Sequence, residues 1–242
     1  MISKRVRNLI KITILGILLN AILPIFGGQQ VQAKIVEEPK IILDLAHKDT
    51  ETDTGATYMQ WNERDIVNSI TMKVGEKLVN NGFTVTYTRD LNKPATIQER
   101  INKANNSDYW LYLSIHANSN EGNIAGTGIE GYSNNEWSLT NNILNDLHNE
   151  FGLIKRSNPI KTPFYNRKIQ NSTLLEIGFI NNDYDRNIML NNEDKIAQII
   201  ADNIIKDYNK EVIAKNCIGG NIVTKEMTMY GGSIIPMKIT YY

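Results

Sequence analysis

The chain has 242 residues, of which 41% are hydrophobic and 21% are charged. These proportions are typical of a globular protein with one main domain. The formal net charge is zero, which argues against a nucleic-acid-binding protein, and the sequence has no glycine-rich loop of the kind that holds dinucleotides or nucleoside triphosphates.

The N-terminal segment has the layout of a secretory signal peptide. It opens with four basic residues, Lys4, Arg5, Arg7 and Lys11. An apolar stretch follows at 12–26, and the small residues of the Val-Gln-Ala sequence at 31–33 suit a signal peptidase. An uncleaved membrane anchor is the alternative, but it needs about 20 apolar residues, and this shorter stretch contains Asn20 and Pro24. We therefore expect residues 1–33 to be removed and the mature protein to be secreted, with no stable membrane insertion.

Apolar runs and amphipathic periods alternate along the rest of the chain. The expected strands cover 40–46, 83–88, 109–115, 127–132 and 173–179, and the expected helices begin near residues 62, 96, 137 and 193. This alternation predicts an α/β fold, in which helices pack on a β-sheet.

Three of these helices have apolar stripes at helical spacing. The stripes are Ile66, Ile70, Val74 and Leu78 in the first helix, Ile97, Ile101 and Ala104 in the second, and Ile196, Ile200 and Ile204 in the last. Thr96 and Glu99 form a capping-box pattern at the start of the second helix, and Gly82 is placed to end the first. We expect these stripes to be buried in the core, and they indicate nothing about chemistry.

Residues 155–172 form a long irregular connection with five basic residues and no acidic one. Long connections in compact domains are commonly functional, and a basic loop beside an active site would suit an acidic substrate. Arg167 is the candidate substrate-binding residue in this segment. A solvated loop without such a role is the alternative.

The sequence pattern changes after Lys210. Residues 219–230 and 231–242 are two tandem 12-residue units that share both glycines, an isoleucine, a threonine and the final tyrosine. A Gly-Gly turn followed by a strand-like run predicts a small β-hairpin-like appendage. The expected organisation is a signal peptide (1–33), a catalytic domain (34–210) and a C-terminal tail (211–242).

Two of the expected strands end on histidines, His47 and His116. Ligands of open α/β sheets bind beyond the carboxyl ends of the strands, so both imidazoles could point into one crevice. A third strand, 173–179, places Glu176 in an otherwise apolar run. A carboxylate there is costly to bury unless it is paired, bound to metal or kept near neutral for catalysis.

Glu63 lies three residues before Ile66 and therefore on the same helix face as the buried stripe. With Asn62 as the expected N-cap, Glu63 falls in the first helical turn. A negative charge in that turn is also favoured by the helix dipole, so a simple dipole charge is the alternative explanation.

Together, two histidines and one carboxylate match the ligand set of a catalytic zinc site, which leaves its fourth position to water. A second carboxylate held off the metal can take a proton and return it to a leaving amine. A single histidine at a strand end is more often structural, so the inference depends on the combination. The remaining histidine, His148, follows Leu147 on an amphipathic segment, and we expect it at the surface.

Seven short blocks carry a family resemblance. They are IILDLAH, TGA, NERDI, YTRD, ERINKAN, YLSIHANS and LLEIGFINNDYD, and they lie in this order over about residues 40–209. In this order they resemble the zinc-dependent N-acetylmuramoyl-L-alanine amidases of type 3, a group found in autolysins, sporulation enzymes and phage lysins.

The resemblance implies a twisted, mixed and mostly parallel β-sheet flanked by helices. It also implies a zinc ion held by His47, Glu63 and His116, with Glu176 as the catalytic acid/base. The implied reaction is hydrolysis of the amide bond between N-acetylmuramic acid and L-alanine in peptidoglycan, and the implied location is the cell wall.

The sequence departs from the family pattern around the first histidine. The family usually has glycine-histidine-glycine-glycine there, and this chain has Ala46-His47-Lys48-Asp49. Glycine permits backbone angles and close approaches that other residues resist. We therefore expect the His47 loop to be shifted or the floor of the substrate site to be reshaped.

Two other functions fit the same residues. A zinc peptidase acting within the stem peptide or cross-bridge would use the same metal chemistry. A non-catalytic wall-binding protein would have lost turnover through the altered His47 loop. Because all four functional positions retain their side chains, the sequence favours the amidase. It does not indicate an oligomeric state.

Overall fold

The computed structural model describes residues 39–47, 53–120, 126–134, 138–156 and 169–217. Three sequence predictions lie outside the described residues: the signal peptide at 1–33, the tandem units at 219–242 and the role of Arg167.

The described part of the chain contains a five-stranded sheet with the strand order β4-β1-β5-β7-β6. Its strands are β1 (Lys40–Asp44), β4 (Thr84–Tyr87), β5 (Leu111–Asn118), β6 (Glu130–Ser133) and β7 (Ser172–Phe179). The first four in spatial order are parallel, and β6 pairs antiparallel with β7 at one edge. The prediction of a mixed, mostly parallel sheet is confirmed. A separate two-stranded hairpin, β2 (Thr57–Tyr58) and β3 (Trp61–Asn62), was not predicted.

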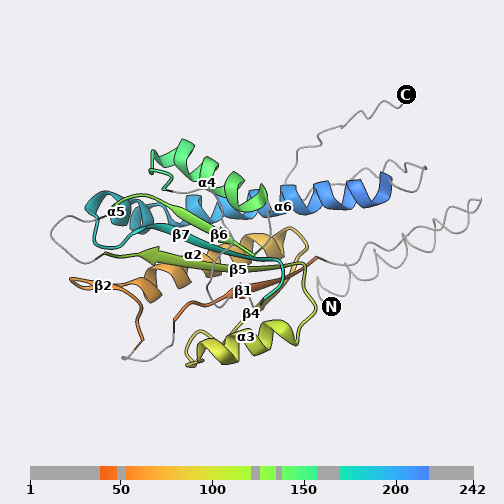
Figure 1. Ribbon diagram of the computed structural model, residues 1–242, viewed down its shortest axis with the longest axis horizontal. Coiled ribbons are helices and arrows are strands. Elements are labelled where there is room, and N and C mark those ends of the chain that lie inside the picture. The colour runs from red at the N-terminus through yellow and green to blue at the C-terminus, as the bar shows by residue number, and fades with distance from the viewer. Residues whose placement is uncertain (1–38, 48–52, 121–125, 135–137, 157–168, 218–242) are drawn as a thin grey trace, which may run out of the picture. The chain divides into compact units, whose positions relative to one another are not determined.

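Helices cover both faces of this sheet. They are α2 (Glu63–Asn80), α3 (Ile97–Asn105), α4 (Ser138–Phe151), α5 (Asp183–Asn191) and α6 (Glu193–Cys217). In Figure 1, α4 and α6 lie on one side of the sheet and α3 on the other. Four of these helices begin within one residue of the predicted positions, and α5 was not predicted. Among the described residues, none of the helices is both long enough and apolar enough to cross a membrane.

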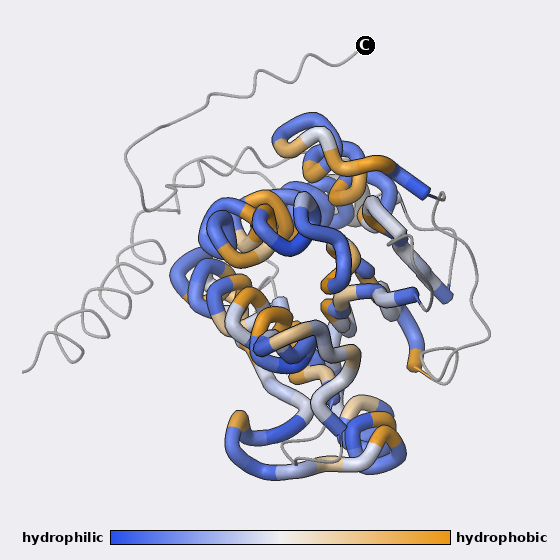
Figure 2. Tube along the Cα trace, turned by 90° about the vertical axis from the view of Figure 1, so that its left-hand side faces the viewer, coloured by the Kyte–Doolittle hydropathy of each residue, from blue (hydrophilic) through white to orange (hydrophobic). Residues whose placement is uncertain are grey.

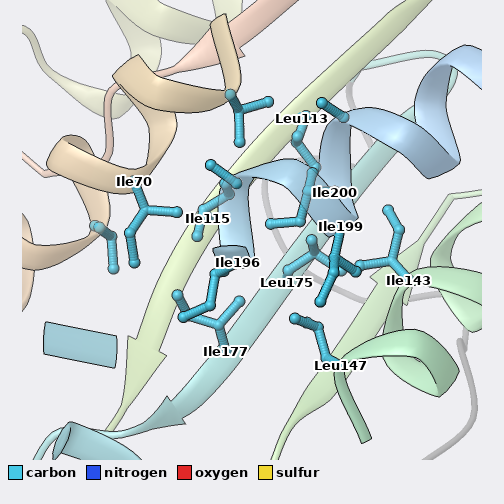
Figure 3. Close-up of a cluster of buried hydrophobic side chains, with 14 of the residues drawn as sticks. Ile70, Leu113, Ile115, Ile143, Leu147, Leu175, Ile177, Ile196, Ile199 and Ile200 are labelled. Atoms are coloured by element: carbon cyan, nitrogen blue, oxygen red, sulfur yellow. The ribbon is translucent and has the colours of Figure 1, made fainter. Parts of the chain in front are cut away.

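The main core lies between the sheet and the layer formed by α2, α4 and α6. Figure 3 shows it as a convergence of Ile70 from α2, Leu113 and Ile115 from β5, Leu175 and Ile177 from β7, Ile143 and Leu147 from α4, and Ile196, Ile199 and Ile200 from α6. Side chains alternate between the two faces of a strand. Ile41 and Leu43 of β1 therefore join this core, and Ile42 joins a smaller cluster with Ile101 and Tyr112 under α3. Hydrophobic and hydrophilic stretches alternate along the helices in Figure 2, as amphipathic segments require.

The predicted stripes of the first and last helices are confirmed. All four stripe residues of α2 and all three stripe residues of α6 are buried. The α2 helix ends at Asn80, and Gly82 follows with a φ of +85°, a left-handed conformation that suits glycine after a helix.

The stripe of α3 is only partly as predicted. The capping box between Thr96 and Glu99 is present, and Ile101 and Ala104 are buried, but Ile97 is 47% exposed. Ile97 is the first helical residue, so it lies beyond the small cluster that covers the rest of the stripe. The buried position one turn later belongs to Arg100, which pairs with Asp44 at 2.6 Å.

The C-terminal half of α6 packs at the amino ends of the strands. The Tyr208 ring contacts Phe83, which precedes β4, and Trp110, which precedes β5. The indole Nε1 of Trp110 donates to the Glu211 carboxylate. The helix thus continues through Lys210, where the sequence pattern changes, and ends at Cys217.

Candidate metal centre

Glu63 is the first residue of α2, and its carboxylate is buried with 5% of the residue exposed. Its Oε2 accepts a 2.8 Å hydrogen bond from the Ala56 amide, and its Oε1 accepts a 3.1 Å bond from the Ala117 amide. Asn62 occupies the N-cap position, as predicted, but makes no side-chain capping bond. A charge that served only the helix dipole would not need burial. The two amide bonds instead orient the Glu63 carboxylate toward the carboxyl edge of the sheet.

Both predicted histidines contact this carboxylate. Nε2 of His47 and Nδ1 of His116 each lie 2.9 Å from the same Oε1 of Glu63. The two imidazole rings are edge-on, with centroids 5.0 Å apart. One ligand atom from each of the three residues lies within 4.8 Å of the others, which makes them a group that could hold a metal ion.

The two histidines reach the Glu63 carboxylate from different parts of the chain, His47 from the segment after β1 and His116 from β5. His47 follows the end of β1 by three residues, as an end-of-strand ligand should. The prediction that His116 ends its strand was wrong, because β5 continues to Asn118. The reason is that β5 keeps pairing with β7 past His116, with a shift of register between His116 and Asn118. A polar side chain ends an apolar run without ending the hydrogen-bonded ladder.

The donor atoms fit a metal. Nε2 of His116 is buried and makes no hydrogen bond, and a buried ring nitrogen without a partner is rare outside functional sites. On its other side, His47 Nδ1 lies 3.1 Å from Oδ1 of Asp53. Metal-binding histidines commonly pair their second ring nitrogen with a carboxylate in this way.

The charges of the group reinforce one another. Burial alone would raise the pKa of Glu63, but the imidazoles of His116 and His47 outweigh burial and hold this pKa well below its usual range. Burial would lower the pKa of His47, and the Glu63 and Asp53 carboxylates outweigh it and raise that pKa. The site therefore keeps a negative carboxylate and attracts positive charge, which a cation can supply in place of protons.

Gly55 lies against the group. A Cβ added there would be 2.5 Å from Glu63 Oε2 and 2.6 Å from His47 Nε2, and the φ of Gly55 is +69°. Both the space and the backbone conformation require glycine. The backbone of the Thr-Gly-Ala block at 54–56 therefore lies directly against the Glu63 and His47 side chains.

Glu176 lies beside the group but outside it. In the sheet register His116 of β5 is opposite Glu176 of β7, which is opposite Glu130 of β6. The three residues therefore form a row on one face of the sheet. Burial, and then the negative charges of Glu63 and Glu130, raise the pKa of Glu176 well above its usual value. A carboxyl with a raised pKa is suited to exchange protons near neutral pH.

Sequence reasoning missed Asp53 and the surroundings of Glu130. The Glu130 carboxylate accepts hydrogen bonds from Tyr132 Oη and Arg156 Nε, and the Arg156 guanidinium lies 4.8 Å from the centre of the Phe179 ring. Arg156 belongs to the basic segment 155–172. The sequence signal for Glu130 is a charged residue within the expected strand 127–132. That signal is weak, because a charged side chain on an edge strand can point into solvent.

His148 is exposed on α4, and its Nδ1 lies 2.8 Å from the Leu153 carbonyl. The prediction of a surface histidine is confirmed.

Comparison with known proteins decides the family. Residues 41–206 match the family model described as N-acetylmuramoyl-L-alanine amidase. The chain belongs to this amidase family. Among its relatives is the N-acetylmuramoyl-L-alanine amidase LytC of Bacillus subtilis (strain 168), with 30% identity over 190 residues. That match covers 75% of this chain and 38% of LytC, so the chain matches less than half of LytC's length.

Solved structures of amidases share the fold. An N-acetylmuramoyl-L-alanine amidase from Clostridium difficile 630 superposes with a TM-score of 0.65 at 20% identity, covering 72% of this chain and 98% of the other. The catalytic domain of the amidase CwlV from Bacillus (Paenibacillus) polymyxa var. colistinus gives a TM-score of 0.60 at 26% identity, covering 71% and 98%. The amidase fold accordingly includes the sheet and helices that surround the metal centre.

Proposed function

We propose that this protein is a zinc-dependent N-acetylmuramoyl-L-alanine amidase, which hydrolyses the amide bond between N-acetylmuramic acid and L-alanine in peptidoglycan. The observation that carries the proposal is the group of His47, Glu63 and His116, in which the ring nitrogen Nε2 of His116 is buried without a hydrogen-bond partner, next to a carboxyl group with a raised pKa. Membership of the amidase family supports this choice of substrate.

His47, Glu63 and His116 would hold the metal. Two imidazoles and one carboxylate are the protein ligands of many catalytic zinc sites, and three protein ligands leave a position open. Zinc bound there would polarise the scissile carbonyl and make a water molecule acidic near neutral pH. The Ala56 and Ala117 amides would keep the Glu63 carboxylate oriented, and Asp53 would orient the His47 ring.

Glu176 would move the proton. As a carboxylate it takes a proton from the attacking water, and as a carboxylic acid it returns that proton to the alanine nitrogen as the amide bond breaks. Both roles require a pKa near the working pH, and burial together with Glu63 and Glu130 raises the pKa in that direction.

The basic segment 155–172 would meet the stem peptide, whose carboxylates suit positive side chains. We assign Arg167 this contact. Arg156, at the start of the same segment, binds Glu130 in the row that contains Glu176. This contact places Arg156 itself beside that row. Peptidoglycan lies outside the cytoplasmic membrane, so the proposal also requires export, in agreement with the signal-peptide layout of the first 33 residues.

The proposal is tested with Glu176→Gln, which keeps the size of the side chain but cannot take a proton. Glu150→Gln on α4 is the matched control, because Glu150 lies on the surface and pairs only with Lys195 among the contacts observed. We expect Glu176→Gln to bind one zinc ion per chain and to lose about 10²–10⁴-fold in turnover of muropeptides. The control should retain both properties.

Mass spectrometry of the products identifies the bond that is cut. Stem peptides with a free N-terminal L-alanine support the amidase. Cleavage inside the stem or cross-bridge would identify a zinc peptidase, and binding to sacculi without release of soluble fragments would identify a wall-binding protein. A Glu176→Gln variant with full activity would place the proton transfer elsewhere.

A further inference from the structure

The backbone that carries His47 lies beyond the end of a β-ladder. β1 and β4 are parallel neighbours whose pairing ends at Leu43 and Tyr87. Two more bonds follow, from the Thr88 amide to the Leu43 carbonyl at 3.0 Å and from the Leu45 amide to Thr88 Oγ1 at 3.1 Å. The ladder between β1 and β4 ends there, and the next carbonyls along the chain, those of Leu45, Ala46 and His47, need other hydrogen-bond donors.

The Arg89 side chain supplies them instead. Its Nε donates to the carbonyls of Leu45 and His47, both at 3.0 Å, and its Nη2 donates to the Ala46 carbonyl at 3.2 Å. On the other side, Nη1 donates to the carbonyls at positions 90 and 91 of its own loop, at 3.1 and 2.7 Å. The residue is buried, with 5% exposed. The guanidinium therefore supplies hydrogen-bond donors beyond the end of the β-ladder. It also joins the loop after β4 to the loop after β1.

These bonds hold a backbone that needs support. His47 has a φ of +62°, in the left-handed region that residues with a Cβ rarely adopt. Such conformations persist where the surroundings fix them, and they cluster at ligand sites. The family pattern has glycines beside this histidine, whereas the chain has Ala46 before it. A second donor, Asn68 Nδ2 of α2, binds the Ala46 carbonyl at 3.2 Å.

We propose that Arg89 is a positioning residue for the metal ligand His47. By binding three successive carbonyls it fixes the left-handed turn, so that the imidazole Nε2 is presented to the metal while Nδ1 faces Asp53. The inference rests on the proposed function, because it needs a metal at this site. Arginine is required because its planar fork offers five donors in fixed directions, and a lysine ammonium offers three on a flexible stem.

The test compares Arg89→Lys with the wild type by competition for zinc against a chromogenic chelator. Loss of a residue that orients a ligand commonly weakens metal affinity about 10–100-fold, and we expect a loss in that range. At saturating zinc, KM should be unchanged. Ile204→Ala is the stability control, because Ile204 is buried in α6, an element that carries none of the site residues. It should lower the free energy of unfolding without weakening zinc binding.

The outcomes separate the two proposals. A wild type that binds no zinc would contradict the proposed metal site. A wild type that binds zinc, together with an Arg89→Lys variant of equal affinity, would contradict the role of Arg89. If Arg89→Lys does not fold, Asn68→Ala decides, since it removes only the second donor to the same turn. A loss of zinc affinity of about two- to tenfold supports the inference, and an unchanged affinity overturns it.

Discussion

Two of the buried carboxylates of this fold, those of Asp44 and Glu63, differ in their surroundings. Asp44, the last residue of β1, accepts a bond from Thr88 on Oδ1, and bonds from Arg100 and Ser114 on Oδ2. Glu63 accepts two backbone amides and contacts two imidazoles. Fixed donors occupy both oxygens of Asp44, and the cluster around it is closed.

The cluster around Glu63 is open, because the imidazole Nε2 of His116 is buried without a hydrogen-bond partner. A buried polar network in which every group is hydrogen-bonded contributes rigidity. A network with an unpaired group lowers the stability of the fold unless a ligand completes it. The difference teaches that burial of a carboxylate alone does not identify a functional site. A buried imidazole nitrogen without a hydrogen-bond partner beside the carboxylate is the feature that points to a ligand.

The largest expected effect is that of His116→Ala on the open cluster. It removes one of three proposed ligands, so zinc binding and muropeptide hydrolysis should fall together to background. The free energy of unfolding of the zinc-free protein should also fall, because the variant removes the 2.9 Å contact between His116 Nδ1 and the buried Glu63 carboxylate. Zinc content by atomic absorption and hydrolysis by chromatography check this. A zinc-loaded, active variant would mean that the cluster is not the metal centre.

Asp44→Asn should affect the closed cluster in the opposite way. Leaving Arg100 without its charged partner should cost about 3–5 kcal/mol of stability, as for other broken buried ion pairs, while zinc affinity of the folded protein stays near that of the wild type. Urea titration measures the first quantity and chelator competition the second. A variant with weakened zinc binding and normal stability would reverse the assignment of the two clusters.

The stability of Asp44→Asn relative to the wild type should depend on pH. Burial alone would raise the pKa of Asp44, but Arg100, with help from Thr88, outweighs it and holds the pKa below the ordinary value of 3.8. A depressed folded-state pKa contributes stability above pH 3.8, and that contribution is lost as the pH falls through the folded-state pKa. The stability difference between wild type and Asp44→Asn should therefore be full at neutral pH and shrink in acid.

The smallest expected effect is that of Glu130→Gln, which changes the charge beside Glu176 without touching either cluster. Burial is the largest cause of the raised pKa of Glu176, followed by Glu63 and Glu130. Removing the Glu130 charge should lower this pKa, so the base form persists to lower pH. The acid limb of the profile of kcat/KM against pH should move to lower pH, with less than about tenfold change in the plateau. A limb that does not move would show that Glu130 and Glu176 are not coupled.

Much of the fold and site could be predicted because local patterns and global packing agree. The stripes of α2 and α6 follow from periodicity, and the capping box of α3 follows from the spacing of Thr96 and Glu99. His47 and His116 could be placed together because parallel strands bring their carboxyl ends to one edge, and Glu63 could be added because it shares the helix face of the buried stripe.

The remainder depends on long-range contacts. Helix α5 was missed because its nine residues, though capped by Asn182, run almost directly into α6. Asp53 and Arg89 are polar residues in loops, and only the folded chain shows that one meets the His47 ring and the other its backbone. The burial of Arg100 in place of Ile97 depends on Asp44, which is 56 residues away in the sequence.

The packing of α6 has a consequence for which end of the sheet stays accessible. Tyr208 and Glu211 of this helix contact Phe83 and Trp110 at the amino ends of the strands, whereas the group of His47, Glu63 and His116 lies toward their carboxyl ends. A partner that bound at the amino ends of the strands would therefore leave this group accessible at the opposite end of the sheet.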